Sequence, residues 1–232
     1  TLPLVVGVDW RDPSLVPMPL GDPKMVALSN LRVAFHTDNG IVVPTTETVA
    51  VVRAAARVLA DAGIAIEEAR PQGIEQTYDL YFGFFAADGG TGLQKRLQML
   101  GTAEISPLLQ QSLKLFGPYL RTTTEFFSFI VNLDLFRSTM LTFLEKYDVI
   151  LCPVNAYPAL PHGTTWDNLS AFTYTMTYNL TGWPGVVVRG GTSPEGLPIG
   201  VQVIARPWRE DVALAVAQSL ERALGGRQRP PL

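Results

Sequence analysis

The chain has 232 residues, of which 47% are hydrophobic and 17% are charged, and this composition suits one substantial globular core. The formal net charge is −3 and no basic cluster is longer than Lys95–Arg96, which disfavours nucleic acid as a partner. The wholly apolar runs are far shorter than the roughly 20 residues that a membrane-spanning helix needs. We therefore expect a single domain over residues 1–232, with no transmembrane segment, in the cytoplasm.

The first part of the chain predicts a linker followed by a β–α–β unit. Residues 1–30 are rich in Pro and Asp, so we expect a linker-like segment on the surface. A strand is expected over residues 31–35, a helix over about 47–62, and a second strand over 64–68. This order predicts an α/β fold with a mixed β-sheet flanked by helices.

Residues 77–146 are mainly helical in pattern and unusually rich in phenylalanine. Glycines at 89–92 and the Gly117–Pro118 pair divide this region into separate helices. Its rings either pack as an ordinary helical layer or line a substrate channel for an apolar acyl or aryl group, and both interpretations stay open. The rings belong to Phe82, Phe84, Phe85, Phe116, Phe126, Phe127, Phe129, Phe136 and Phe143.

The stretch from residue 166 onward begins with a predicted helix that carries one apolar side. Leu169, Phe172 and Met176 are spaced i, i+3 and i+7, which places them on the same side of a helix. Gly182 and Pro184 then end that helix.

Two strands are predicted after this helix, and a third strand before it. Residues 186–188 and 199–204 are apolar and β-branched, and residues 192–196 form a turn between them. Residues 148–152 are a short buried strand. A helix over about 210–224 follows, so several strands of one sheet are brought together with helices on their faces.

Two sequence blocks in this stretch carry a resemblance to a known family. They are Asn179-Leu180-Thr181-Gly182-Trp183-Pro184 and Gly196-Leu197-Pro198-Ile199-Gly200-Val201-Gln202. In order and spacing they are similar to the C-terminal hallmark of the amidase signature family, which are serine hydrolases of carboxamides. The preceding Tyr174-Thr175-Met176-Thr177-Tyr178-Asn179 resembles the fatty acid amide hydrolase branch. The resemblance implies an amidase-signature-like fold of which this chain is the C-terminal half.

The resemblance also implies a catalytic apparatus that this chain does not contain. The family uses a nucleophilic Ser, a bridging Ser and a Lys base, which come from a Gly-Gly-Ser-Ser-Gly segment and an upstream Lys. Neither occurs here, and Gly190-Gly191-Thr192-Ser193 is followed by Pro194 in the expected turn. We expect no catalytic residue in this chain and no hydrolysis by the chain alone. The N-terminal catalytic half is an implied partner, and no cofactor is expected.

The resemblance further implies that Leu169, Phe172 and Met176 line the substrate pocket, although ordinary core packing suits the same pattern. Amidotransferase relatives that use glutamine carry an acidic residue near the start of this helix, where the present chain has Phe172. Without a carboxylate to pair with a substrate's amino group, the site favours a small apolar acyl or aryl amide.

The other motif residues are expected to be structural. Asn179 is placed to bond backbone at the helix end, and Gln202 is placed on a strand to make a structural hydrogen bond. His36, His162 and Cys152 lack metal-ligand spacing, so no metal site is predicted. The expected structural positions are Tyr178, Asn179, Gly182, Trp183, Pro184, Gly196, Gly200 and Gln202.

Two other classes of function are compatible with the sequence. The chain could be a catalytically inactive binding or scaffold module derived from an amidase, which would expose a large apolar surface where a partner segment is missing. It could also be a hydrolase that uses Thr1 as an N-terminal nucleophile, with its own α-amine as base. A homodimer is left open.

Overall fold

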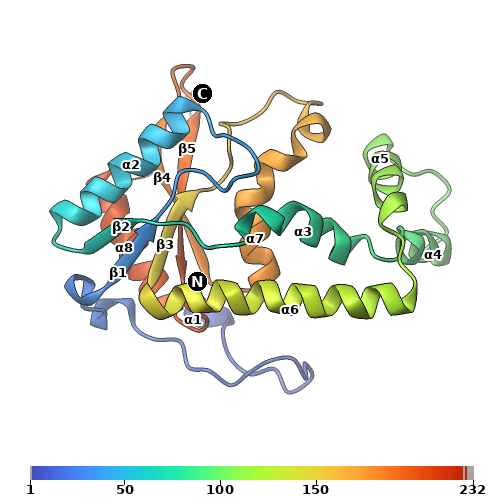
Figure 1. Ribbon diagram of the computed structural model, residues 1–232, viewed down its shortest axis with the longest axis horizontal. Helices are drawn as coiled ribbons and strands as arrows, with labels where there is room; N and C mark the ends of the chain where they lie inside the picture. Colours follow the sequence, from blue (N-terminus) through green and yellow to red (C-terminus); the bar gives the residue numbers. More distant parts are fainter. Residues whose placement is uncertain (1, 227, 229–232) are drawn as a thin grey trace.

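The computed structural model describes residues 2–226 and 228, and at its centre is one five-stranded mixed sheet (Figure 1). The strand order is β2-β1-β3-β5-β4, in which β1 is parallel to β2 and β3, and β5 is antiparallel to β3 and β4. The predicted mixed α/β sheet is confirmed. The strands are β1 (Arg32–Phe35), β2 (Ala65–Glu68), β3 (Val149–Pro153), β4 (Gly185–Thr192) and β5 (Pro198–Ala205).

Helices cover both faces of the sheet, and each face has its own apolar core (Figure 1). α2 and α8 pack on one face, whereas α3, α6 and α7 pack on the other. The α-helices are α1 (Leu2–Val5), α2 (Thr46–Asp61), α3 (Thr77–Phe85), α4 (Thr91–Met99), α5 (Pro107–Phe116), α6 (Thr123–Lys146), α7 (Thr173–Thr181) and α8 (Glu210–Ala223). Short 3₁₀ helices are η1 (Pro23–Met25), η2 (Leu28–Asn30), η3 (Ile74–Gln76), η4 (Gly117–Tyr119) and η5 (Thr165–Phe172).

The β1–α2–β2 unit forms where the sequence predicts it, to within two residues at each boundary. The hydroxyl of Thr45 accepts a hydrogen bond from the Thr48 N–H and caps α2, which satisfies one of its free N–H groups. Val52 and Leu59 of α2 are fully buried against the sheet. Gly63 then takes a φ of 82°, which lets the chain reverse into β2.

The predicted C-terminal hairpin of β4 and β5 is also confirmed. Gly196 closes its turn with a left-handed φ of 86° and donates a hydrogen bond to the Ser193 carbonyl at 3.0 Å. A β-bulge interrupts the pairing between Arg189 and Gly191. At the bulge a Cβ on Gly190 would lie 2.6 Å from Val51, so the missing side chain allows α2 to approach the strand.

The phenylalanine-rich region forms the four helices α3 to α6, of which α6 is the longest. One face of α6 is buried, whereas α4 and α5 have no buried residue. In Figure 1, α4 and α5 lie away from the sheet, near the end of α6 where that helix begins. Phe82, Phe129 and Phe136 are core residues, but Phe127 is 68% exposed. By length and composition alone, α6 is apolar enough to cross a membrane, a test that a helix packed on a protein core also meets. The residues of its buried face are Phe129, Leu133, Phe136, Met140 and Leu144.

The first 30 residues contain three short helices, α1, η1 and η2, none of which the sequence predicted. Residues 6–22 between them have neither helix nor strand, and nearly all of their side chains are exposed. Thr1, the residue on which the N-terminal nucleophile hypothesis depends, lies outside the described residues.

Candidate functional site

The predicted helix that carries Leu169, Phe172 and Met176 is in fact two helices that meet at Phe172. η5 ends at Phe172 and α7 begins at Thr173. The backbone leaves helical geometry at Asn168, with φ −125° and ψ 27°, and the Asn168 side chain donates to the Thr164 carbonyl at 2.9 Å. An Asn side chain that bonds local backbone competes with the helical pattern, which explains why one continuous helix was the wrong prediction.

The three predicted substrate-binding residues still lie on the same side of the two helices despite this break. Leu169 and Phe172 are three residues apart in a 3₁₀ helix, where such side chains eclipse one another, and Met176 follows Phe172 by one α-helical turn. Their burial differs, because Met176 is 7% exposed whereas Leu169 and Phe172 are half-buried. Phe172 packs against a small buried cluster of Ala156, Ala171 and Tyr174, as do the partly buried Val42 and Tyr157. Of the three residues, Phe172 is therefore the one whose partly exposed ring lies with other apolar side chains that a bound molecule can also contact.

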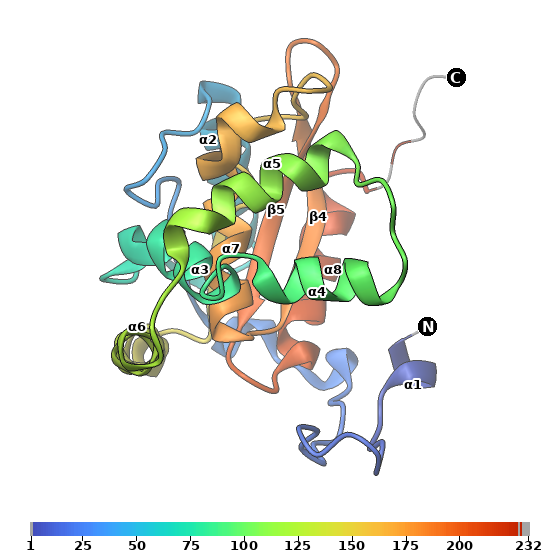
Figure 2. The same cartoon turned by 90° about the vertical axis from the view of Figure 1, so that its right-hand side faces the viewer.

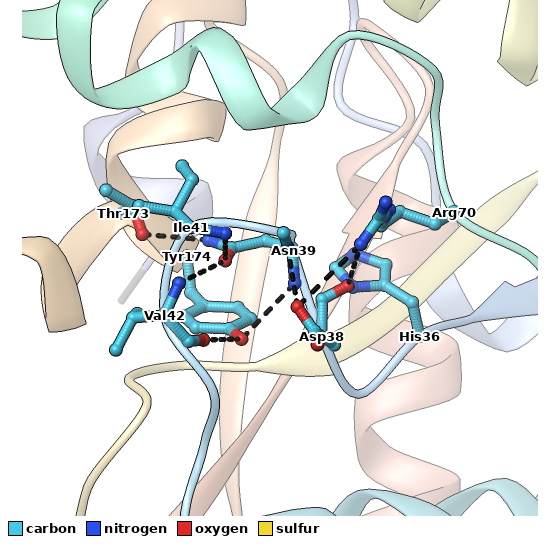
Figure 3. Close-up of polar contacts among 9 residues, drawn as sticks. His36, Asp38, Asn39, Ile41, Val42, Arg70, Thr173 and Tyr174 are labelled. Atoms are coloured by element: carbon cyan, nitrogen blue, oxygen red, sulfur yellow. Dashed lines mark hydrogen bonds and ion pairs between the residues drawn. The ribbon is translucent and has the colours of Figure 1, made fainter.

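The loop between β1 and α2 fastens the start of α7 (Figure 3). Asn39 is fully buried, and its side chain donates to the Thr173 hydroxyl at 2.8 Å. The Tyr174 hydroxyl donates to the Val42 carbonyl at 3.0 Å and accepts from the Asn39 N–H at 3.3 Å. These bonds hold the β1–α2 loop to the start of α7, so that Val42 and Phe172 pack against the same apolar cluster although they are far apart in sequence.

A second set of polar contacts holds the same helix from its other sides. The hydroxyl groups of Thr77 in α3 and Thr177 in α7 are 2.8 Å apart, and both residues are fully buried. From β5, the Gln202 side chain donates to the Tyr174 carbonyl at 3.1 Å. Gln202 therefore makes the structural hydrogen bond predicted for it. Because buried polar groups need partners, these bonds specify one position for α7.

His36 directly follows β1, and its ring lies 6.5 Å from the Tyr174 ring of α7. It is 3% exposed, and its Nδ1 lies 3.1 Å from the Asp38 carbonyl, while its Nε2 has no hydrogen-bond partner in the described part of the chain. Burial lowers the pKa of His36 to about 4 despite the Asp38 carbonyl, and the nearby Arg70 charge lowers it further. The imidazole is therefore neutral at pH 7.

Cys152 is a buried small residue, as predicted, and its surroundings make it unreactive. Its thiol accepts from the Gln202 amide at 3.4 Å and lies 3.7 Å from the Tyr178 hydroxyl. Burial raises the pKa of Cys152 to about 11, so the nucleophilic thiolate does not form near neutral pH. Within the described residues, no three His, Cys, Asp or Glu side chains are grouped to hold a metal ion.

The motif residues after α7 build the connection to β4. Gly182 ends the helix with a φ of 70° and donates to the Tyr178 carbonyl at 2.9 Å, and Trp183 is 7% exposed in the core with Tyr178. The Pro184 carbonyl accepts from Ala205 at 3.1 Å. Asn179 was expected to form a hydrogen bond with the backbone at the helix end. It is exposed, and no hydrogen bond of its side chain is found in the described structure. The left-handed glycine ends the helix instead.

Gly200 and Gly196 are the remaining motif positions, and both have a steric or conformational reason to be glycine. A Cβ on Gly200 would lie 3.0 Å from both Val154 and Val187, so the strand surface is tightly packed there. Gly196 supplies the left-handed residue of the hairpin turn. The structural role expected for both positions stays a prediction.

Sequence reasoning missed Asn39, Thr173, Tyr174 and His36 as members of the site. Asp38-Asn39-Gly40 indicates only a turn, because these residue types are common in turns and their long-range partners are not visible in a sequence. All four lysines of the chain, Lys24, Lys95, Lys114 and Lys146, are at least partly exposed. None of them lies in the buried position that a proton-accepting lysine of this kind occupies.

The mixed sheet with helices on both faces and the helix before the Gly-Trp-Pro corner agree with the resemblance that the sequence carries. The family model described as Amidase matches residues 2–214, and the chain belongs to this family. Fatty acid amide hydrolase 1 of Caenorhabditis elegans is 23% identical over 269 residues, covering 94% of this chain and 47% of the relative. A glutamyl-tRNA(Gln) amidotransferase subunit of Roseobacter denitrificans is 39% identical over 93 residues, covering 38% of this chain and 19% of the relative.

Solved structures give the same fold. A bacterial aryl acylamidase of the amidase signature family superposes with a TM-score of 0.73 at 20% identity, covering 94% of this chain and 49% of that one. A fatty acid amide hydrolase superposes with a TM-score of 0.71 at 19% identity, covering 94% and 42%. The chain thus spans about half the length, or less, of the relatives it matches.

Proposed function

We propose that this chain is the substrate-side half of an amidase of the Ser-Ser-Lys type, which hydrolyses apolar acyl or aryl amides. The observation that carries the proposal is the apolar cluster of Ala156, Ala171 and Tyr174, against which the partly buried Val42, Tyr157 and Phe172 pack. Hydrogen bonds of Asn39 and Tyr174 hold the β1–α2 loop to the start of α7 at this place. The cluster follows the carboxyl ends of the parallel strands β1 and β3, where α/β proteins commonly bind ligands.

The chemical groups for hydrolysis come from a separate catalytic half in this proposal. The exposure of the lysines and the lack of a Gly-Gly-Ser-Ser-Gly segment in the sequence support this division. The limited coverage of each relative supports it too, because about half of the matched relatives lies outside the aligned region. The chain alone is expected to be inactive toward amides.

The polarity of the cluster supports an apolar substrate over glutamine. Asp38 is the nearest carboxylate along the loop, and it already pairs with Arg70 at 3.7 Å. A substrate with a free ammonium group would lose its hydration against Phe172 without gaining an ion pair, which is unfavourable. An acyl chain or aryl ring loses nothing comparable and gains about 25 cal/mol for each Å² of apolar surface that it buries.

Phe172→Asp tests the proposal in an assembly of this chain with a segment that carries the family's Gly-Gly-Ser-Ser-Gly sequence. We expect kcat/KM for a long-chain acyl amide and for an anilide to fall roughly 10- to 100-fold, since an apolar side-chain contact of about 1.5–3 kcal/mol is lost. Thermal unfolding should change little because Phe172 is half-buried. Phe127→Asp is the matched control, because Phe127 is 68% exposed on α6 and outside the cluster.

The outcomes separate the candidate functions. Unchanged kinetics of the Phe172 variant with both apolar substrates would remove this residue from the substrate wall. If the assembly bound apolar amides without hydrolysing them, the hypothesis of a catalytically inactive binding module would be favoured instead. A preference for glutamine over apolar amides would overturn the substrate class and leave the amidase proposal standing.

A further inference from the structure

A groove lies between α3 and α6, and the proposed function makes no use of it. In Figure 2, where α6 is seen end-on, α3 lies beside this helix. A cavity of about 440 Å³ between the two helices continues into a second one of about 360 Å³, and Leu80, Phe129 and Asn132 line both. The groove shares no residue with the apolar cluster against which Phe172 packs. It is therefore a separate candidate for a binding site.

Arg121 lines the larger cavity and is held there by its surroundings. Its Cζ lies 4.7 Å from the centre of the Phe129 ring, so the guanidinium stacks on an aromatic face. Its main-chain N–H donates to the Ala87 carbonyl at 3.0 Å, which fixes residue 121 beside the end of α3. A Cβ on Gly83 would lie 2.5 Å from the Phe129 ring and 3.1 Å from Nη2 of Arg121. Glycine destabilises a helix interior, and this close approach gives α3 a reason to carry one.

The guanidinium of Arg121 nevertheless has a hydrogen-bond donor that nothing satisfies. Its Nε is buried and has no hydrogen-bond partner among the described residues. Within the same residues, no carboxylate forms an ion pair with Arg121. An unpaired buried donor is costly, most of all on a charged group, so we expect the acceptor to come from outside the chain. A carboxylate is the acceptor that fits a guanidinium best, because its two oxygens accept two parallel hydrogen bonds.

Two acidic residues of the same cavity define a second requirement for the ligand. They are Asp79 and Glu125. The main-chain N–H and the hydroxyl of Thr122 both donate to Oε2 of Glu125, at 2.7 and 2.8 Å. These hydrogen bonds lower the pKa of Glu125, and the charge of Arg121 lowers it further, so Glu125 is ionised at pH 7. Two carboxylates beside one guanidinium repel a simple anion but attract a ligand that also carries an ammonium group.

We propose that the groove between α3 and α6 binds a free amino acid, with its carboxylate on Arg121 and its ammonium group on Asp79. Asp79 is chosen over Glu125 because Glu125 already accepts two hydrogen bonds from Thr122. The second cavity receives the side chain of the amino acid, and its lining by Leu80, Leu135 and Phe136 favours an apolar one. This site goes beyond the proposed amidase function and does not depend on it.

Calorimetric titration of the chain with L-leucine tests the site, because two analogues each remove one charged group. Isocaproate lacks the ammonium group, and isopentylamine lacks the carboxylate. We expect saturable binding of leucine and roughly 10- to 100-fold weaker binding of either analogue, since each loses a hydrogen bond between charged groups.

Variants of the two charged residues assign the contacts. Arg121→Met keeps an aliphatic chain over Phe129 but loses the guanidinium, so leucine should bind roughly 10- to 100-fold more weakly. Arg57→Met is the matched control and should bind leucine normally, because Arg57 is exposed on α2 and outside the groove. Asp79→Asn should weaken the binding of leucine but not that of isocaproate.

The Nε–H resonance of Arg121 gives a readout in the unaltered chain, so it does not depend on whether a variant folds. In nuclear magnetic resonance spectra, leucine should shift this resonance, whereas isopentylamine should not. Binding of leucine that leaves the resonance unchanged would place the amino acid elsewhere and overturn the proposal. Equal affinities for leucine and isocaproate, or no saturable binding of leucine, would also overturn it. Each of these results leaves the proposed amidase function standing, because the two sites share no residue.

Discussion

α6 and α7 pack on the same face of the sheet, but different interactions hold them there. The buried face of α6 is wholly apolar, from Phe129 to Leu144. α7 buries two threonines and two tyrosines whose hydroxyl groups contact the β1–α2 loop, α3 and β3. Apolar packing tolerates small shifts, whereas a buried hydrogen-bond network is satisfied in one arrangement. Under the proposed function, this difference means that α7 is held in one position as the substrate wall and that α6 supports it.

The apolar packing of α6 gives the largest expected effect on stability. Leu133→Ala removes a fully buried side chain from the middle of α6 and leaves a cavity, so the free energy of unfolding should fall by about 2–5 kcal/mol. Leu135→Ala on the same helix is the control, because Leu135 is 61% exposed and its loss should change stability by less than about 0.5 kcal/mol. Urea unfolding followed by circular dichroism measures both, and equal effects would contradict the assignment of the two faces.

The polar contacts of α7 are accompanied by a pH dependence that we expect from His36, whose ring lies 6.5 Å from that of Tyr174. Its folded pKa of about 4 is below the ordinary value of 6.5, so between these values the unfolded chain takes up a proton and the folded chain does not. Stability is therefore full above about pH 6.5 and falls as the pH approaches 4, by roughly 3 kcal/mol in total.

His36→Asn separates this contribution from that of other groups. The Asn side chain can still donate to the Asp38 carbonyl but does not titrate. Asp148 and Asp211 have lowered pKa values, so they lose their contribution only below about pH 4 and do not interfere. The free energy of unfolding of the two proteins is compared at pH 7 and about pH 4.5. Parallel losses in the wild type and the variant would show that His36 is not buried as a neutral group.

The sheet, α2 and the hairpin could be predicted from the sequence, but the division between η5 and α7 and the tethers of α7 could not. Apolar periodicity and the glycines that end α2 and α7 are local signals, and they predicted the sheet, the hairpin and the ends of these two helices closely. The bond from Asn39 to Thr173 joins residues 134 positions apart. No local pattern distinguishes such an Asn from a turn residue, and the same uncertainty led to the unobserved role expected for Asn179.

The hydroxyl pair between α3 and α7 predicts a smaller effect than either preceding change. Thr177→Val leaves the buried Thr77 hydroxyl without its partner, which should cost about 1–3 kcal/mol. Thr77→Val alone should cost less, because Thr177 also donates to the Thr173 carbonyl. The double variant leaves no unpaired hydroxyl, so it should be more stable than the sum of the two losses predicts. Strict additivity in this cycle would argue against the pair.

Arg137 joins the two helices and gives the smallest expected effect. From α6, its Nε donates to the Leu180 carbonyl at 2.8 Å, in the last turn of α7, where carbonyl groups lack helical partners. Arg137→Met keeps much of the aliphatic length but loses this bond, so we expect a loss of about 0.5–1.5 kcal/mol. Asp134→Ala removes only the exposed ion pair of Arg137 and should change stability by less than about 0.5 kcal/mol. If Asp134→Ala cost as much as Arg137→Met, the surface ion pair rather than the bond to α7 would explain the role of this arginine.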